Sequence, residues 1–351
     1  MSSSSQSSDE KSQFPRSVVL NPRCMRIRGN PTIPASAVGG TKFYVLSDPG
    51  VWSHNANVMG VYNWVVKSLC KTEGVSVIST KEAASRRIPI LPFQSWDLIA
   101  PGVKSYLVFS AWEKWIADNG GVRASRSGAL SATQKAILAK VRGETANRTT
   151  HGGLWQRFDG WSIWLNIGAI SAAMIVDRSW LSSDEKRGLL WREMYLHCEH
   201  HGHVNEKGAG RLIWDGIVGA VPPVRISTWN LRPIDWAKRP AAGTADLKKF
   251  NSWKNGKTGV GIVDACMTQL QKTGMLSNRG RMIAASYLIS DLELDWRFGE
   301  AVFANWLRDY DPVQNLYNWC WMYRNRHYRA LSAEAQQRKF DPKKEFRADC
   351  F

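Results

Sequence analysis

The stretch over residues 255–321 constrains the fold more than any other part of this chain. It is a series of amphipathic segments separated by Gly and Asp-Pro breaks, in which Ile283, Tyr287 and Leu288 recur at helical spacing. This spacing predicts helices with one buried face. Polar residues stand on or near that face at Asn278, Arg281, Asp309, Asp311 and Asn315. Because charged side chains are rarely buried without partners, we expect Arg281 to pair with Asp309.

Four groups of motifs follow one another along this stretch. They are Gly-Lys-Thr-Gly from 256 with Val-Asp-Ala-Cys-Met from 263, Asn-Arg-Gly-Arg-Met-Ile from 278, Asp-Trp-Arg-Phe-Gly-Glu from 295, and Asp-Tyr-Asp-Pro from 309 with Asn-Trp-Cys-Trp from 318. In order and spacing they resemble the flavin-binding half of the photolyase and cryptochrome family. A match of this length is far more specific than one short motif.

The resemblance implies an α+β fold that is predominantly α, in which a photolyase-like helical FAD-binding domain follows a reduced parallel α/β unit. Composition divides the chain accordingly. The predicted parts are a disordered Ser-rich and basic arm over 1–40, a truncated α/β antenna-like domain over 41–120, a linker over 121–157 and the helical domain over 158–351.

The antenna-like part contains the elements of a small parallel unit. β-rich runs occupy residues 42–46 and 75–78, with a helical pattern at 57–72 between them and another at 111–116. The opening strands of the family's antenna domain have no counterpart, which leaves a sheet edge exposed. The arm, a second copy of the chain or an assembly partner could cover that edge. The same loss means that an antenna chromophore is not expected.

Two positions depart from the family pattern. The run over 160–171 resembles a hydroxyl-rich loop at a helix N-terminus that binds the FAD pyrophosphate. Only Ser162 keeps such a hydroxyl, and the bulky Trp161 and Trp164 replace small or polar residues. Further along, Gly188 stands where repair enzymes carry an acid that helps to hold the flipped lesion. We therefore expect that the chain does not carry out light-driven DNA repair. FAD binding stays an open possibility.

The resemblance also assigns roles to individual residues. The cofactor-binding set would be Ser162, Arg192, Asn278, Arg281, Asp309, Asp311 and Asn315. The catalytic set would be an electron relay from Trp236 at the surface through Trp296 to Trp319, with Asn315 facing the flavin N5 side. A nucleic-acid pocket would be lined by Trp191, Trp321, Asn278 and Arg279. Stacking in such a pocket contributes on the order of 1–3 kcal/mol per base.

Charge and composition limit the kinds of partner that the chain could bind. A formal net charge of +17 favours DNA or RNA, although a generically basic protein would have the same charge. No apolar run is long enough to span a bilayer, so we expect no membrane partner. The six cysteines form no CxxC pair, which favours reduced thiols in an intracellular setting, whether nucleus, cytoplasm, organelle or virion. The His- and Cys-rich run over 197–203 lacks a second ligand group at zinc spacing, so no metal is expected.

Two functions of different classes remain open. One is a photolyase- or cryptochrome-like protein that binds FAD and nucleic acid and carries out blue-light-driven electron transfer. Whether it would be an enzyme, a carbon–carbon lyase, stays open. The other is a flavin-free protein of the same fold, built as a structural component into a nucleoprotein assembly such as a ribosome-like particle or a virion. In that case the ion pair and the tryptophans would persist as packing.

Overall fold

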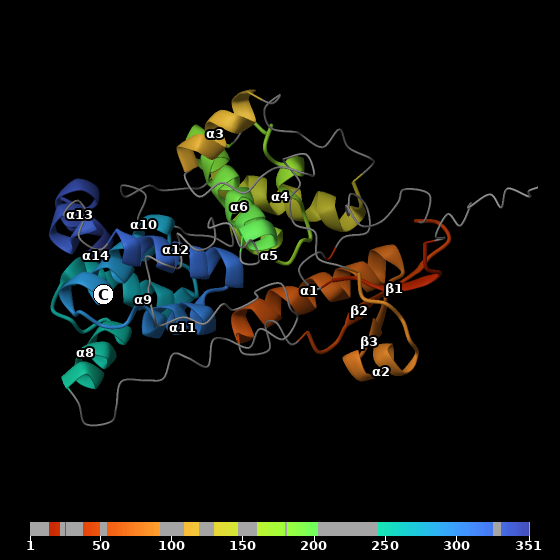
Figure 1. Ribbon diagram of the computed structural model, residues 1–351, viewed down its shortest axis with the longest axis horizontal. Coiled ribbons are helices and arrows are strands. Elements are labelled where there is room, and N and C mark those ends of the chain that lie inside the picture. Colours follow the sequence, from red (N-terminus) through yellow and green to blue (C-terminus); the bar gives the residue numbers. More distant parts are fainter. Residues whose placement is uncertain are drawn as a thin grey trace, which may run out of the picture.

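The computed structural model describes residues 14–21, 25, 38–49, 55–91, 109–118, 130–146, 160–179, 181–202, 245–325 and 331–350. Helices dominate these residues, and a small sheet lies at one end of the molecule (Figure 1). The helix α1 (Ala56–Glu73) lies between the C-terminal helices, beside which it begins, and the sheet, toward which it runs. The mainly helical α+β fold predicted from the sequence is thus confirmed.

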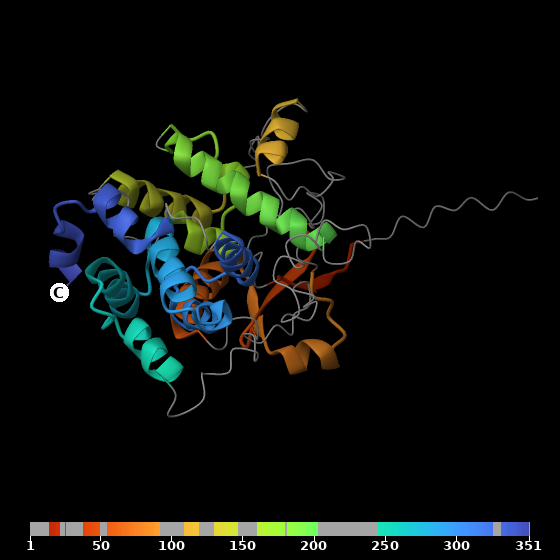
Figure 2. The same ribbon diagram turned by 60° about the vertical axis from the view of Figure 1, so that its left-hand side comes forward.

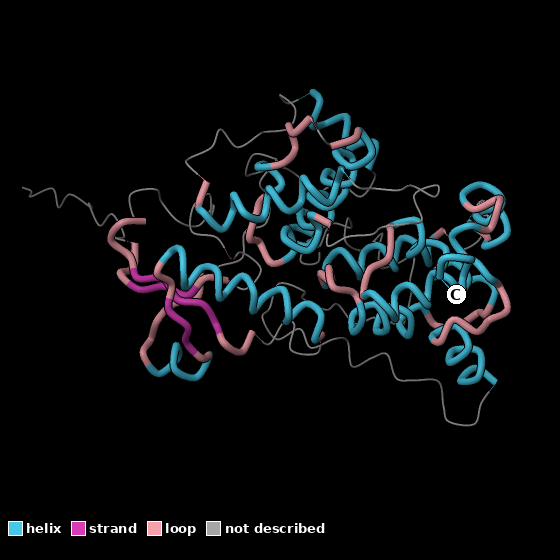
Figure 3. The backbone as a smooth tube through the Cα atoms, turned by 180° about the vertical axis from the view of Figure 1, so that it is seen from behind, coloured by secondary structure: helices cyan, strands magenta, loops and turns pink. Residues whose placement is uncertain are grey.

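The sheet has three parallel strands in the order β1-β2-β3, drawn in magenta in Figure 3. They are β1 (Ser17–Val19), β2 (Lys42–Leu46) and β3 (Ser76–Ile78). The predicted runs at 42–46 and 75–78 are therefore strands. The prediction of a disordered arm over 1–40 is wrong for residues 17–19, because β1 pairs with one edge of β2. Of the three candidates for covering the sheet edge, the arm itself does so.

Burial explains why this short segment forms a strand. Val18, Val19 and Leu20 are completely buried in spite of the polar residues that precede them. A parallel bridge joins Val19 to Ile90 on the other side of β1. Apolar residues at the sheet therefore outweigh the local Ser-rich composition.

The helix α1 joins the sheet to the helical part of the molecule. Its cap, Asn55, accepts hydrogen bonds from the backbone of Asn57 and Val58 through Oδ1. The Asn55 Nδ2 group donates to the carbonyl oxygens of Ala304 at 2.7 Å and Leu307 at 2.8 Å. One buried amide therefore begins α1 and also satisfies carbonyls at the end of a distant helix.

Two groups of helices make up the rest of the described fold. The first contains α3 (Phe109–Asp118), α4 (Ala132–Ala146), α5 (Trp161–Asn166), the 3₁₀ turn η3 (Ala172–Met174) and α6 (Ser183–Gly202). The predicted helix near 111–116 corresponds to α3, and α4 lies within the predicted linker over 121–157. Within this group α3 packs on α6, whereas α4 packs on α1. A short helix α2 (Thr80–Ser85) follows the sheet.

The second group is C-terminal. It contains α8 (Ala245–Lys254), α9 (Gly261–Thr273), α10 (Asn278–Ser286), the π-helix η4 (Tyr287–Asp291), α11 (Trp296–Trp306), α12 (Pro312–Arg324), α13 (Ala333–Phe340) and α14 (Glu345–Cys350). The helix α6 packs on α12 and so brings the two groups together (Figure 2).

The Gly-Lys-Thr-Gly motif forms the turn that precedes α9. The Asp264 carboxylate accepts hydrogen bonds from the backbone N–H groups of Thr258 at 2.7 Å and Gly259 at 2.9 Å. Gly256 and Gly259 have φ angles of +62° and +83°, in the left-handed region that favours glycine. The backbone N–H groups of Thr258 and Gly259 are thus hydrogen-bonded within the chain, at the start of α9.

Candidate functional site

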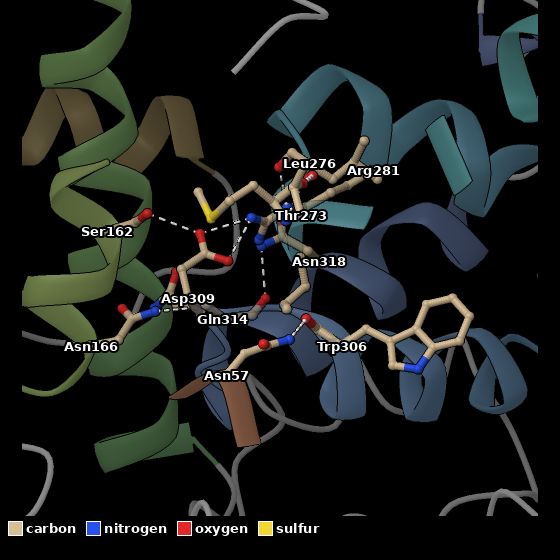
Figure 4. A network of polar contacts seen from close by, with 12 residues as sticks. Asn57, Ser162, Asn166, Thr273, Leu276, Arg281, Trp306, Asp309, Gln314 and Asn318 are labelled. Atoms are coloured by element: carbon tan, nitrogen blue, oxygen red, sulfur yellow. Dashed lines mark hydrogen bonds and ion pairs between the residues drawn. The ribbon is translucent and has the colours of Figure 1, made fainter. Parts of the chain in front are cut away.

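The centre of the candidate site is the ion pair between Arg281 on α10 and Asp309, which lies between α11 and α12 (Figure 4). One terminal nitrogen of Arg281 donates to both carboxylate oxygens of Asp309 at 2.7 Å. Arg281 Nε donates to the Leu276 carbonyl oxygen at 2.8 Å, which fixes the guanidinium. The pairing predicted from the sequence is confirmed. Charged hydrogen bonds of this length are among the strong ones in proteins.

Asp309 also ties α5 to the C-terminal helices. The Ser162 hydroxyl donates to Asp309 Oδ2 at 2.9 Å, and the Asn166 side-chain amide donates to the Asp309 carbonyl oxygen. Ser162 was predicted to contact the pyrophosphate of FAD, but here its hydroxyl is held by a carboxylate. Sequence reasoning missed Asn166, although this buried amide stands in the same run as Ser162.

Asp311 begins α12. Its carboxylate accepts hydrogen bonds from the backbone N–H groups of Val313 and Gln314, both at 3.0 Å, and Pro312 occupies the first turn. These are the features of a helix N-terminus. In the described structure, this residue of the predicted cofactor set therefore has a capping role.

Asn315, one turn into α12, contacts a buried glutamate that sequence reasoning missed. Its Nδ2 group donates to Glu300 Oε1 at 2.9 Å and to the Glu300 carbonyl oxygen at 3.3 Å. Glu300 lies on α11 with 1% of its surface exposed, and burial raises the pKa of its carboxyl to about 7. The signal in the sequence was a carboxylate following Gly299 in an otherwise apolar helix segment.

Arg192 on α6 reaches toward α5. Its two terminal nitrogens donate to the Leu165 carbonyl oxygen and to Glu193 Oε1, both at 3.2 Å. Arg192 Nε is buried and has no hydrogen-bond partner among the described residues. A buried donor without a partner is uncommon in proteins and marks a position that a ligand could satisfy.

Two of the predicted relay tryptophans are core residues. Trp296 and Trp319 are both buried, and the ring of Trp319 lies edge-on to Phe303 with centroids 5.0 Å apart. A Cβ atom on Gly299 would come within 2.1 Å of the Trp319 ring, so the glycine makes room for the indole. Trp236 lies outside the described residues.

The four residues of the predicted nucleic-acid pocket contact different neighbours. Trp191 stacks on Phe109 of α3, with ring centroids 3.9 Å apart and planes at 7°. The Arg279 guanidinium lies 4.3 Å from the ring centre of Phe340 on α13. Asn278 is exposed at the start of α10, and Trp321 is 37% exposed on α12. In the described arrangement, Phe109 therefore occupies the stacking position beside Trp191.

The described residues contain neither a metal-binding cluster nor a helix suited to cross a bilayer. There, no group of three or more His, Cys, Asp and Glu side chains is placed to hold a metal ion. His197 is buried, with its ring centre 5.1 Å from that of Trp112, and His203 lies outside the described residues. None of the described helices combines the length and the apolar character needed to cross a bilayer.

Comparison with known proteins identifies similar sequences. Residues 186–349 match a family model described as the FAD binding domain of DNA photolyase. The chain is 34% identical over 205 residues to a deoxyribodipyrimidine photo-lyase of Vibrio cholerae, an alignment that covers 53% of this chain and 38% of that protein. It is 45% identical over 102 residues to a cryptochrome DASH of Vibrio parahaemolyticus, covering 28% of this chain and 23% of the relative. Only a part of each relative's length is therefore represented.

Solved structures share the fold. The archaeal photolyase from Sulfolobus tokodaii, which was crystallised with two FAD molecules, superposes with a TM-score of 0.62 and 18% identity over 95% of this chain and 89% of that one. A bacterial class III photolyase from Agrobacterium tumefaciens gives a TM-score of 0.61 and 18% identity over 97% of this chain and 88% of that one. At this identity the likeness concerns the fold alone.

Proposed function

We propose that this chain, whose residues 186–349 match the family model for the FAD binding domain of DNA photolyase, binds FAD around the Arg281–Asp309 pair. The observation that carries the proposal is the network in which Ser162, Arg281 and Asp309 connect α5, α10 and the start of α12. If the ion pair only stabilised the fold, the site would need no polar group without a hydrogen-bond partner. Here Arg192 Nε is buried and lacks a hydrogen-bond partner among the described residues.

The described residues fit a flavin dinucleotide, because Arg192 of the predicted cofactor-binding set carries a buried donor without a partner. Arg192 Nε is an unused donor, and Glu300 Oε2 is an unused acceptor among the described residues. Arg192 Nε is a position that a phosphate oxygen or another acceptor of such a ligand could satisfy. Arg192, Arg281 and Asp309 would hold the group, and Asn315 would orient it. When bound, FAD would supply blue-light absorption and one-electron redox chemistry.

We further propose that Trp319, Trp296 and Trp236 carry an electron between this site and the surface. Trp319 and Trp296 are buried, which would keep water away from an oxidised indole. The formal net charge of +17 supports nucleic acid as the polyanionic partner of the protein. Base extrusion is not part of the proposal, because Phe109 covers one face of Trp191.

The test is the visible spectrum of the purified full-length chain after incubation with FAD and removal of unbound cofactor. We expect a bound-flavin band that changes on blue illumination. Asp309→Asn should retain less flavin, since the neutral amide weakens the contact with Arg281. Glu334→Gln is the matched control, because Glu334 forms an exposed ion pair with Arg338 on α13. A colourless wild-type protein would overturn the proposal.

A second candidate is favoured by the stack of Phe109 on Trp191. It is a flavin-free protein that uses the same fold and its basic surface as a structural part of a nucleoprotein assembly. Such a protein would bind nucleic acid with a steep salt dependence and take up no FAD. Asn315→Ala discriminates the two candidates, because it would alter flavin redox behaviour in the first and change nucleic-acid binding in neither.

A further inference from the structure

Glu300 is the most unusual titratable group outside the predicted site set. Its side chain lies inside the molecule between α11 and α12, and Oε1 is occupied by the Asn315 amide. Oε2 is equally buried and has no hydrogen-bond partner among the described residues. A buried carboxylate oxygen without a donor favours the protonated form of the group.

The contacts of Glu300 also fix the orientation of Asn315. Both atoms that face the Asn315 amide, Glu300 Oε1 and the Glu300 carbonyl oxygen, are hydrogen-bond acceptors. Only the NH₂ end of the amide can satisfy them. Asn315 Oδ1 is therefore turned away from Glu300 and remains an acceptor for a bound group.

Among the described residues, Cys320 is a titratable group whose pKa depends on the charge of Glu300. The Cys320 thiol on α12 is buried, and burial together with the Glu300 charge raises its pKa well above the ordinary value. The neighbours next to Gly299 are apolar, namely Leu288 of η4 and the ring of Trp319. In the described structure, neither Cys320 nor these apolar groups offer a positive charge to an ionised Glu300.

We propose that Glu300 is a positioning residue that fixes the Asn315 amide and takes up a proton on Oε2 when negative charge enters the site beside Asn315. The inference rests on the proposed binding of FAD. An added negative charge disfavours a nearby carboxylate in a medium of low dielectric constant, and protonation removes the repulsion. Since the proton goes to Oε2, Oε1 continues to accept from Asn315 Nδ2 and the amide keeps its orientation.

The proton and electron balance is simple. An external reductant of the dithionite class delivers the electrons to the bound cofactor. A buffer acid in the solvent loses a proton, and a new O–H bond forms at Glu300 Oε2. Reoxidation reverses both changes. Asn315 neither gains nor loses a proton, because its amide does not titrate at neutral pH.

The first measurement uses the flavin-free full-length chain. The infrared band of a protonated carboxyl should appear in the wild type as the pH falls through about 7. It should be missing in Glu300→Gln and present in Glu293→Gln, which removes an exposed carboxylate from the same region. A wild type without this band would overturn the inference, whatever the chain does with FAD.

The second measurement counts protons taken up when the FAD-loaded chain is reduced in weak buffer with an indicator dye. At about pH 8 Glu300 is mostly ionised, so the wild type should take up more protons than Glu300→Gln, by up to one per chain. Glu293→Gln should match the wild type. Equal uptake by the wild type and Glu300→Gln would overturn this inference while leaving FAD binding intact.

A further variant covers the case in which Glu300→Gln does not fold. Glu300→Asp keeps a carboxyl but moves it away from the Asn315 amide, so the infrared titration should persist at a shifted pH. An unshifted titration in Glu300→Asp would show that the contact with Asn315 does not set the proton affinity. A chain that takes up no FAD would overturn the proposed function and the redox coupling together.

Discussion

Phe109 and Trp191 lie face to face, with their ring centroids 3.9 Å apart and their planes 7° from parallel. The guanidinium of Arg187 lies over the Phe109 ring at 5.1 Å and forms an ion pair with Glu113. Phe109 is therefore held between an indole and a cation, and α3 covers the indole that the family resemblance assigns to a nucleotide pocket. A base that stacked on this face of Trp191 would have to displace α3.

Phe109→Leu tests this arrangement. The smaller, non-aromatic side chain would free the Trp191 face at a modest cost in packing. Since base stacking contributes about 1–3 kcal/mol, affinity for a single-stranded oligonucleotide should rise about 5- to 150-fold. The gain should vanish in the double variant Phe109→Leu/Trp191→Ala. Unchanged affinity in a folded Phe109→Leu variant would show that Phe109 does not block a binding surface. Titration with a fluorescent oligonucleotide at fixed salt measures the effect.

Gly299 should tolerate no side chain. A methyl group there would lie 2.1 Å from the Trp319 ring, so the indole or α11 must shift. Overpacking of this kind costs about 1–3 kcal/mol, and we expect Gly299→Ala to lower the free energy of unfolding by at least that amount. Gly60→Ala is the control, because in the described part of the chain no atom beyond the adjoining backbone of α1 lies within 4 Å of a methyl group there. It should stabilise the chain by about 0.4–1 kcal/mol. Urea unfolding of the wild type and both variants measures these changes in the free energy of unfolding.

Asn55→Ala should be more destabilising than the loss of an ordinary helix cap. Loss of a cap costs about 1 kcal/mol, and leaving a buried carbonyl unsatisfied costs about 1–3 kcal/mol. Because Asn55 also donates to Ala304 and Leu307, we expect a loss of about 2–4 kcal/mol in unfolding free energy. Ser79→Ala removes the cap of α2, which makes no such bridge to another described helix, and should cost about 1 kcal/mol. Equal losses in the two variants would contradict a bridging role for Asn55.

The stability of the chain should depend on pH through Glu300. The folded-state pKa is raised from 4.5 to about 7, so the folded chain binds this proton more tightly than the unfolded chain. The stabilising contribution is complete below about pH 4.5 and is lost as the pH rises through about 7. At about 1.4 kcal/mol per pKa unit the loss is roughly 3 kcal/mol.

Glu300→Gln should abolish this dependence. Relative to the wild type, its unfolding free energy should rise as the pH increases, with the gain reaching roughly 3 kcal/mol near pH 8. Glu293→Gln, which changes an exposed carboxylate, should follow the wild-type profile. Chemical unfolding at a series of pH values provides the comparison. Parallel profiles for the wild type and Glu300→Gln would rule out the raised proton affinity.

Part of this structure could be predicted because the signals were local. Apolar residues at helical spacing identified α1, and charged residues beside a buried face required Arg281 to pair with Asp309. In contrast, β1 has only three residues and follows a polar segment, and its pairing depends on a strand that begins at Lys42. No local pattern contains that information.

The missed site residues have a related explanation. Glu300 was visible inside a motif, but its buried environment arises only when α12 places Asn315 against α11. Likewise, the pattern over 111–116 predicted a helix without including Phe109 and without indicating that α3 packs on α6. Long-range packing decided both cases.

The hydrogen bonds of Asn55 have a consequence for the order in which the chain acquires its structure. The carbonyl groups that this amide contacts lie 249 and 252 positions later in the sequence. During synthesis, α1 therefore emerges long before the partners of its cap exist, and contacts so distant in sequence form slowly. The contact that joins the start of α1 to the end of α11 can form only once α11 has been made. Interruption of translation before α11 would leave α1 with a helix start that lacks its final partners.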